Sequence, residues 1–134
     1  MGKAKLAREL VVGADNKVGM LAEVSGIISA AGVNISAISA YAMGEKAIFR
    51  LVTSDNDKAE NVLVQRGFNV TENEVVAVNL PDQVGKAKEV SEKIKLAGIN
   101  LDYIYGSTCG CANTQALMII GSKENKRVMN AINS

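Results

Sequence analysis

One segment of this chain occurs twice, and this duplication restricts the possible folds more than any other feature of the sequence. When the sequence is shifted by 66 positions, residues 18–39 align with residues 84–105 without a gap, and ten of the 22 aligned positions are identical. About one or two identities would be expected between unrelated segments of this length. The 134 residues are therefore expected to form two copies of one small unit, over residues 1–73 and 74–134.

Each copy contains a helix between turn signals. Apolar residues recur at helical spacing and predict one buried face per copy, formed by Leu21, Val24, Ile28 and Ala31 in the first and by Ala87, Val90, Ile94 and Ala97 in the second. Gly32 and Gly98 follow the two helices, where a left-handed C-cap favours glycine. Asn16 and Asp82 precede them, where a short polar side chain can cap free backbone N–H groups.

Short strands surround these helices. They are expected over residues 10–13, 34–41, 47–53 and 68–72 of the first copy and over residues 75–80, 100–107 and 114–120 of the second. A second helix is expected in each copy, with a capping box of Asp57 and Glu60 in the first and a start at Ser122 in the second. The order β-α-β-β-α-β defines an α+β, ferredoxin-like fold with helices on one face of an antiparallel sheet. No fourth strand is visible in the second copy, so it is either absent or supplied by another segment or a partner chain.

The composition argues against several classes of function. A net charge of +1 and an aromatic content of 4% provide neither a field that attracts nucleic acid or membranes nor a surface for stacking bases. The chain contains no histidine, the commonest general base and metal ligand, so no catalytic and no metal site is predicted. The N-terminus lacks the apolar core of a signal peptide, and no apolar stretch is long enough to span a bilayer. We therefore expect a cytoplasmic protein.

Two short motifs occur in the same order in both copies. The first motif is Asn16-Lys17-Val18-Gly19-Met20-Leu21 and Asp82-Gln83-Val84-Gly85-Lys86-Ala87, and the second is Gly32-Val33-Asn34-Ile35 and Gly98-Ile99-Asn100-Leu101. They resemble the pattern of the ACT domain family, in which D/N-x-P-G-x-L is followed by an amphipathic helix and G-[IV]-N-[IL]. Val18 and Val84 replace the proline of that pattern, which only helps to start the helix. The second copy also departs from the pattern at Lys86 and Ala87, so its ligand-binding site, here called a socket, is expected to differ from that of the first copy.

The resemblance implies a non-catalytic regulatory module without a cofactor. It would bind a small molecule, an amino acid, where two repeats or two chains meet. It would form a homodimer and act on a regulated enzyme as its partner. The ligand-binding residues that the resemblance implies are Asn16, Lys17, Val18, Gly19, Met20, Leu21, Asn34 and Ile35 in the first repeat and Asp82, Gln83, Val84, Gly85, Lys86, Asn100 and Leu101 in the second.

The chemistry of these residues suits a small zwitterion. Free N–H groups and the helix dipole at a helix N-terminus favour a ligand carboxylate, and Asn34 carries both a donor and an acceptor. Asp82 suits an ammonium group better than a carboxylate, so we predict either two non-equivalent sockets or one functional and one degenerate socket. The alternative is structural: Asn16 and Asp82 would be only N-caps, and Asn34 and Asn100 only turn residues.

Two other functions stay open on the sequence alone. The chain could be an interaction protein that oligomerises without a ligand. Alternatively, Cys109-Gly-Cys111 could hold a soft metal between two chains, although a plain reduced loop is the simpler interpretation. Tyr103 and Tyr105 alternate along a predicted strand, which places both on one sheet face as packing residues.

Overall fold

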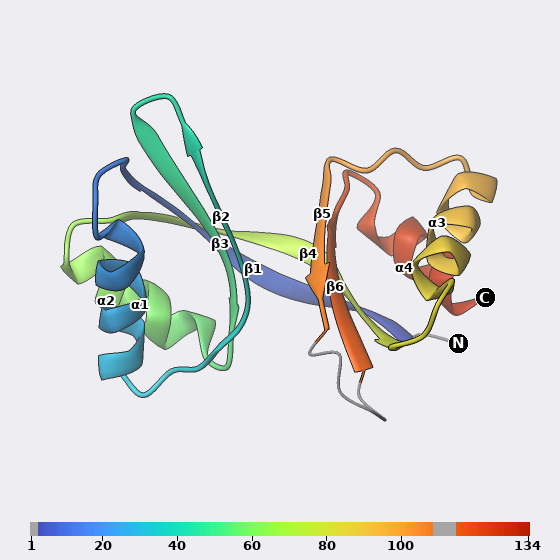
Figure 1. Cartoon of the computed structure of the whole chain (residues 1–134), viewed down its shortest axis with the longest axis horizontal. Helices are drawn as coiled ribbons and strands as arrows, with labels where there is room; N and C mark the ends of the chain where they lie inside the picture. The colour runs from blue at the N-terminus through green and yellow to red at the C-terminus, as the bar shows by residue number, and fades with distance from the viewer. Residues whose placement is uncertain (1–2, 109–114) are drawn as a thin grey trace. The chain divides into compact units, whose positions relative to one another are not determined.

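The computed structural model describes residues 3–108 and 115–134 of the chain. Its elements, in chain order, are β1 (Lys3–Asp15), α1 (Met20–Ala30), β2 (Ile35–Met43), β3 (Lys46–Thr53), α2 (Asn56–Gln65), β4 (Asn69–Pro81), α3 (Lys86–Leu96), β5 (Tyr103–Ser107), β6 (Gln115–Gly121) and α4 (Asn125–Asn133) (Figure 1). In this described part, none of the helices has the length and apolar character needed to cross a membrane. The predicted order β-α-β-β-α-β is confirmed, and the single strand β4 ends the first repeat and begins the second.

The chain divides into two compact units. One consists of Arg8–Asn73 and is called the contiguous unit; the other consists of Met1–Ala7 with Glu74–Ser134 and is called the split unit. The strands follow the order β2-β3-β1-β4-β6-β5, and β1–β3, β2–β3, β4–β6 and β5–β6 pair antiparallel. The contiguous unit therefore has the order β2-β3-β1-β4, and the split unit has the equivalent order β5-β6-β4-β1.

The fourth strand of the split unit comes from the start of the chain. The sequence assigns residues 1–7 to the first repeat and leaves the second repeat, residues 74–134, without a last strand. The structure instead places residues 3–7, the first part of β1, in the split unit beside β4. Pattern analysis missed this strand because it precedes the first repeat, more than 60 positions before the strand with which it pairs.

Side-chain hydrogen bonds fasten this fourth strand to α4. The Asn133 amide nitrogen donates to the Ala4 carbonyl oxygen at 2.8 Å, and the Ala4 N–H donates to Asn133 Oδ1, also at 2.8 Å. Ala4 is buried and Leu6 packs against the core of the split unit. The strand is thus held by its backbone as well as by its apolar side chains.

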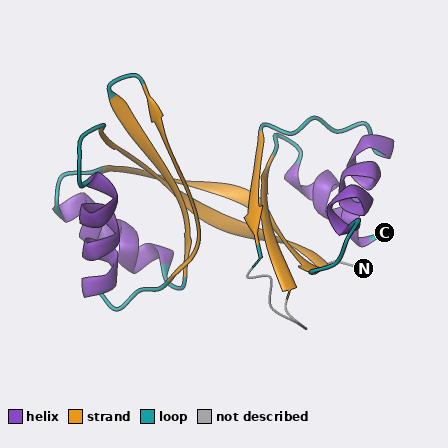
Figure 2. Ribbon diagram, viewed as in Figure 1, coloured by secondary structure: helices purple, strands orange, loops and turns teal. Residues whose placement is uncertain are grey.

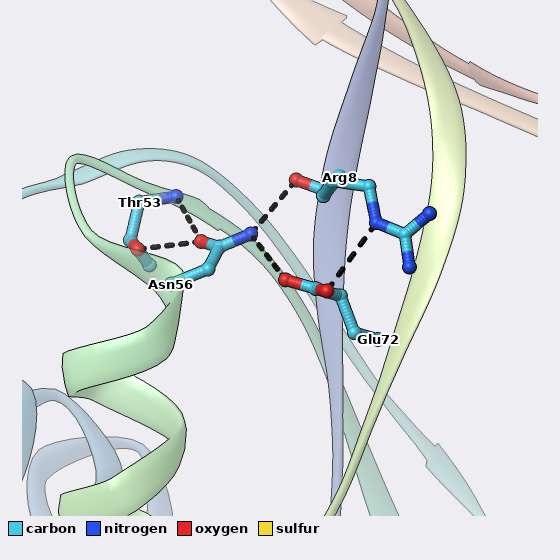
Figure 3. Close-up of polar contacts among 4 residues, drawn as sticks. All are labelled: Arg8, Thr53, Asn56 and Glu72. Carbon is cyan, nitrogen blue, oxygen red and sulfur yellow. Dashed lines mark hydrogen bonds and ion pairs between the residues drawn. The ribbon is translucent and has the colours of Figure 1, made fainter.

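An equivalent asparagine begins the second helix of each unit. Asn56 Oδ1 accepts hydrogen bonds from Thr53 N and Thr53 Oγ1, at 3.2 and 2.6 Å (Figure 3). Its Nδ2 donates to the Arg8 carbonyl at 3.1 Å and to Glu72 at 3.4 Å, while Arg8 Nε lies 3.3 Å from Glu72 Oε1 (Figure 3). These contacts tie the end of β3 and the start of α2 to β1 and β4.

In the split unit, Asn125 repeats this arrangement. Its Oδ1 accepts from Ser122 N at 3.0 Å, and its Nδ2 donates to the Glu74 carbonyl at 2.9 Å. Asn125 stands 69 positions after Asn56, whereas the first halves of the repeats are 66 positions apart. The duplication therefore extends over the whole repeat, with three extra residues between β5 and β6.

Each unit has its own apolar core between its sheet and a layer of helices. Helices α1 and α2 cover one face of the contiguous unit's sheet, and α3 and α4 cover one face of the split unit's sheet (Figure 2). The predicted helix positions Val24, Ile28, Val90 and Ile94 are all buried. This confirms that the helices lie on one face of an antiparallel sheet.

The first residue of each predicted helix face was placed wrongly by the sequence pattern. Leu21 is 54% exposed and Ala87 is also exposed. Met20 is buried instead, because it lies two turns before Ile27 on the face that Val24 also shares. Lys86 takes the position equivalent to Met20 in α3. The two second-helix starts also differ from prediction, since Asp55 rather than Asp57 caps α2, and α4 begins at Asn125 rather than Ser122.

The contacts of Asn133 predict a measurable contribution to stability. Asn133→Ala removes both partners of the buried Ala4 backbone, and we expect the free energy of unfolding to fall by about 1–3 kcal/mol. The control is Asn130→Ala on the exposed side of the same helix, which should stay within about 0.5 kcal/mol of the parent. Urea denaturation followed by circular dichroism measures both variants. Equal unfolding midpoints for the two would contradict the role of Asn133.

Candidate ligand-binding cavities

The loops that precede α1 and α3 are shaped by glycine rather than by polar caps. Gly19 and Gly85 are the N-cap residues, with φ of 88° and 87°, and neither helix has a side-chain cap. The predicted capping by Asn16 and Asp82 is therefore wrong. The cap position lies three residues later, at Gly19 and Gly85. Their backbone is left-handed, a conformation that glycine adopts without strain.

The side chains of Asn16 and Asp82 have other partners. Asn16 Nδ2 donates to the Gly44 carbonyl at 3.5 Å, and its backbone N–H donates to the Glu45 carbonyl at 2.9 Å. Asp82 Oδ2 accepts from Thr108 Oγ1 at 2.6 Å. Each side chain thus ties its loop to a neighbouring strand or strand end of the same unit.

The predicted Asn34 and Asn100 lie at the far end of the first helix. Asn34 N donates to Ser54 Oγ, and its carbonyl accepts from Ser54 N, both at 2.9 Å. The Asn100 carbonyl accepts from Ser122 Oγ at 2.9 Å. An eleven-residue helix such as α1 is about 16 Å long, and the chain enters it from the loop after β1 and leaves it toward β2 (Figure 1). One ligand cannot contact both asparagines within one unit.

The predicted C-caps are confirmed. Gly32 and Gly98 have φ of 77° and 70° and directly follow the C-cap residues of α1 and α3. Val33 N donates to the Ile28 carbonyl and Gly32 N to the Ser29 carbonyl, which is the Schellman pattern. These glycines end the helices and set the direction of β2 and β5.

A cavity of about 310 Å³ lies beside the first loop, in the contiguous unit. Its wall is rich in charge and is formed by Gly13, Ala14, Asp15, Lys17, Met20, Glu23, Lys46, Ile48, Gly67, Phe68 and Asn69. Lys46 Nζ and Asp15 Oδ1 form an ion pair at 3.1 Å, and both side chains are largely exposed. The cavity therefore presents charges of both signs to solvent.

A cavity of about 360 Å³ lies beside the equivalent loop in the split unit. Its wall is mainly apolar and is formed by Leu80, Pro81, Asp82, Gln83, Lys86, Ala87, Ile104, Tyr105, Gly106, Ser107, Thr108, Ala116 and Met118. Both cavities are in the size range of small-ligand sites. They share the loop and the first helix turn, but the second extends toward β5 and β6.

Five of the predicted site residues form walls of these cavities: Lys17 and Met20 in the contiguous unit, and Asp82, Gln83 and Lys86 in the split unit. The others are not among the wall residues; they are Asn16, Val18, Gly19, Leu21, Asn34, Ile35, Val84, Gly85, Asn100 and Leu101. Val18 and Val84 are fully exposed at the tips of their loops. Sequence analysis missed the wall residues that the strands contribute, because its candidates came only from the two loop motifs.

Nothing in the described residues forms a metal centre. Among residues 3–108 and 115–134, no three His, Cys, Asp or Glu side chains lie close enough to hold a metal ion. The C-x-C motif of Cys109 and Cys111 falls outside the described residues. The rings of Tyr103 and Tyr105 stack with centroids 6.3 Å apart, as expected for alternating residues on one sheet face.

The sequence matches a family model over nearly its whole length. The model describes an ACT domain pair and covers residues 6–132. The chain therefore belongs to the family of ACT domain pairs, and the resemblance seen in the two motifs is confirmed. No curated protein sequence matches it.

Solved structures show the same fold. A protein from Bacteroides thetaiotaomicron is 25% identical, with a TM-score of 0.86 over 97% of this chain and 88% of that one. The ligand-free regulatory subunit of aspartate kinase from Thermus thermophilus is 13% identical, with a TM-score of 0.64 over 99% and 95%. Aspartokinase III from E. coli, in complex with lysine and aspartate, is 18% identical, with a TM-score of 0.57 over 98% of this chain and 32% of that one.

Gly19, which caps α1, and Gly26, within α1, should respond to substitution by alanine in opposite directions. Gly19→Ala forces a left-handed conformation on alanine, and we expect a loss of about 1–2 kcal/mol in the free energy of unfolding. Gly26→Ala places a methyl group in open space inside the helix and should add about 0.5–1 kcal/mol. Urea titration of both variants tests the loop geometry. A Gly19→Ala protein as stable as the parent would contradict the left-handed cap.

Proposed function

We propose that this protein is a cytoplasmic, non-catalytic regulatory module that binds a free amino acid. The observation that carries the proposal is a cavity beside the same loop in both units, with predicted ligand residues in its wall. Each repeat therefore has space for a small molecule beside this loop, although the two cavities extend from it in different directions. The family supports a regulatory role, since the ACT pair fold is shared with a regulatory subunit of aspartate kinase.

The charges in the first cavity suit the two charges of an amino acid. Lys17 and Lys46 can attract its carboxylate, while Asp15 and Glu23 can attract its ammonium group. The ion pair of Lys46 with Asp15 is exposed, so a ligand can replace it at little cost. The start of α1 adds a positive dipole end to the same wall.

Assembly is the second part of the proposal. The edge strand β2 exposes Ile38, Tyr41 and Met43, and an exposed apolar edge favours pairing with another chain. A homodimer would cover this edge, and ligand occupancy would then alter the chain's contact with the enzyme that it regulates. A function in assembly alone, without any ligand, is the competing proposal that this edge supports.

A thermal-shift screen over the standard amino acids at millimolar concentration tests the ligand. A ligand that binds only the native state raises stability by about 2.7 kcal/mol at one hundred times its Kd, so Tm should rise for a small set of amino acids. Glu23→Gln alters the first cavity and Lys86→Met the second, and at least one of them should reduce the shift. Lys58→Ala, on α2 and outside both cavities, is the control that should keep it. No shift with any amino acid would contradict the proposal.

Sedimentation velocity distinguishes a dimer that senses a ligand from a protein that only assembles. We expect Met43→Lys to lower the dimer fraction, because a charge on the exposed edge opposes pairing of strands. A ligand sensor should also change its sedimentation when the amino acid that raises Tm is added. A stable dimer that no amino acid affects, in sedimentation or in Tm, would favour the purely structural function.

A further inference from the structure

We propose that the cavity of the split unit is a socket for an amino acid with an uncharged, apolar side chain. The inference rests on the proposed function, because it specifies the ligand of one of the two cavities. It is carried by a comparison of the two units, which share one scaffold but fill the space beneath the first helix differently.

The strand registers identify the residues that are equivalent in the two units. Val12 pairs with Phe49 in the contiguous unit, and Val78 pairs with Met118 in the split unit. Phe49 is 3% exposed and fills the core of its unit. Its equivalent, Met118, is only partly buried and lines the cavity.

The first helix turn shows the same change. Met20 is 6% exposed in the contiguous core, whereas Lys86, at the equivalent place, directs its ammonium group to Glu89 Oε2 at 3.3 Å. Ala87 stands where the first repeat has Leu21 and is much smaller. An aromatic ring and a buried thioether of one unit have thus been replaced around the cavity of the other, which leaves space that the shared scaffold does not fill.

Gly106 lets β5 lie close against β6 at the wall of this cavity. A Cβ atom at Gly106 would lie 2.8 Å from the Leu117 carbonyl oxygen and 3.0 Å from Met118 Cγ. Its equivalent in the contiguous unit is Ala40, which pairs with Phe49 as Gly106 pairs with Met118. The backbone of β5 is therefore itself part of the wall, beside the apolar side chain of Ile104.

The loop of the split unit has lost charges that the other loop carries. Pro81 and Gln83 occupy the positions of Asp15 and Lys17. A ligand side chain that enters between Leu80, Ile104 and Met118 meets hydrocarbon, and a charge placed there would lose its hydration without gaining a partner. This favours an aliphatic or thioether side chain over a charged one.

Polar groups remain at the rim, where the ends of an amino acid would lie. Asp82 is exposed and suits the ammonium group, while Lys86 suits the carboxylate. The partly exposed ion pair of Lys86 with Glu89 contributes little to stability, and the exposed Thr108 hydroxyl, which donates to Asp82, can bond to water instead. The ligand can therefore replace them.

Restoring the residue of the other repeat tests the proposal. Met118→Phe introduces the ring that the scaffold holds at Phe49, and it should fill the cavity. Isothermal titration calorimetry with leucine and methionine, against aspartate and lysine, measures binding to the full chain. We expect leucine or methionine to bind the parent, and Met118→Phe to weaken that binding at least tenfold. The reverse change in the contiguous unit, Phe49→Met, is the matched control, and it should lower Tm but keep the Kd.

A second variant covers the case in which Met118→Phe does not fold. Asp82→Asn removes the charge at the rim without changing its shape, and it should weaken leucine binding at least tenfold. Binding of 4-methylpentanoate, which lacks the ammonium group, should be equal in the parent and in Asp82→Asn.

The outcomes separate this inference from the proposed function. If only aspartate, lysine or other polar amino acids bind, or if leucine binds but both variants keep its Kd, the apolar socket is refuted while amino-acid binding stands. If no amino acid binds the parent, the proposed function fails and the inference fails with it.

Discussion

The pairing of β1 with β4 is the interaction on which both units depend. Residues 3–7 of β1 complete the split unit, and the rest of β1 is the first strand of the contiguous unit. Likewise, β4 belongs to the contiguous unit up to Asn73 and to the split unit from Glu74 onward. Each of the two strands is thirteen residues long, about twice the usual length, because each serves two units. Neither four-stranded sheet is complete without a strand that also belongs to the other.

Much of the fold followed from local patterns, and the errors have identifiable causes. Helices α1 to α4, the glycines after α1 and α3, and the order of elements along the chain were predicted because each depends on residues close together in sequence. The N-caps were wrong because Gly19 and Gly85 provide the cap through a left-handed backbone, which a search for polar side chains does not detect. The missing strand was not found because the whole contiguous unit, Arg8–Asn73, lies in the sequence between residues 3–7 and the part of β4 that belongs to the split unit.

The candidate sites were predicted in part. The loop positions Lys17 and Gln83 line cavities, but Met118, which lines the second cavity, and its equivalent Phe49, which fills the core of the contiguous unit, lie outside the 22-residue alignment. The offset between the copies changes from 66 to 69 before these two residues, so their equivalence becomes visible only through strand register. A shared helix and shared glycines preserve the scaffold, while a few core replacements give each unit a separate interior.

The division of the chain also affects the order in which its parts can fold. All elements of the contiguous unit come from one uninterrupted segment, so its pairings can form as soon as residue 73 has been synthesised. The split unit must instead close a loop between residue 7 and residue 74, a non-local step that slows folding. Until then the first residues of β1 carry an unpaired edge, which is the kind of surface that promotes strand exchange between nascent chains. The amide of Asn133, near the other end of the split unit, can bind this edge only when the last helix is in place.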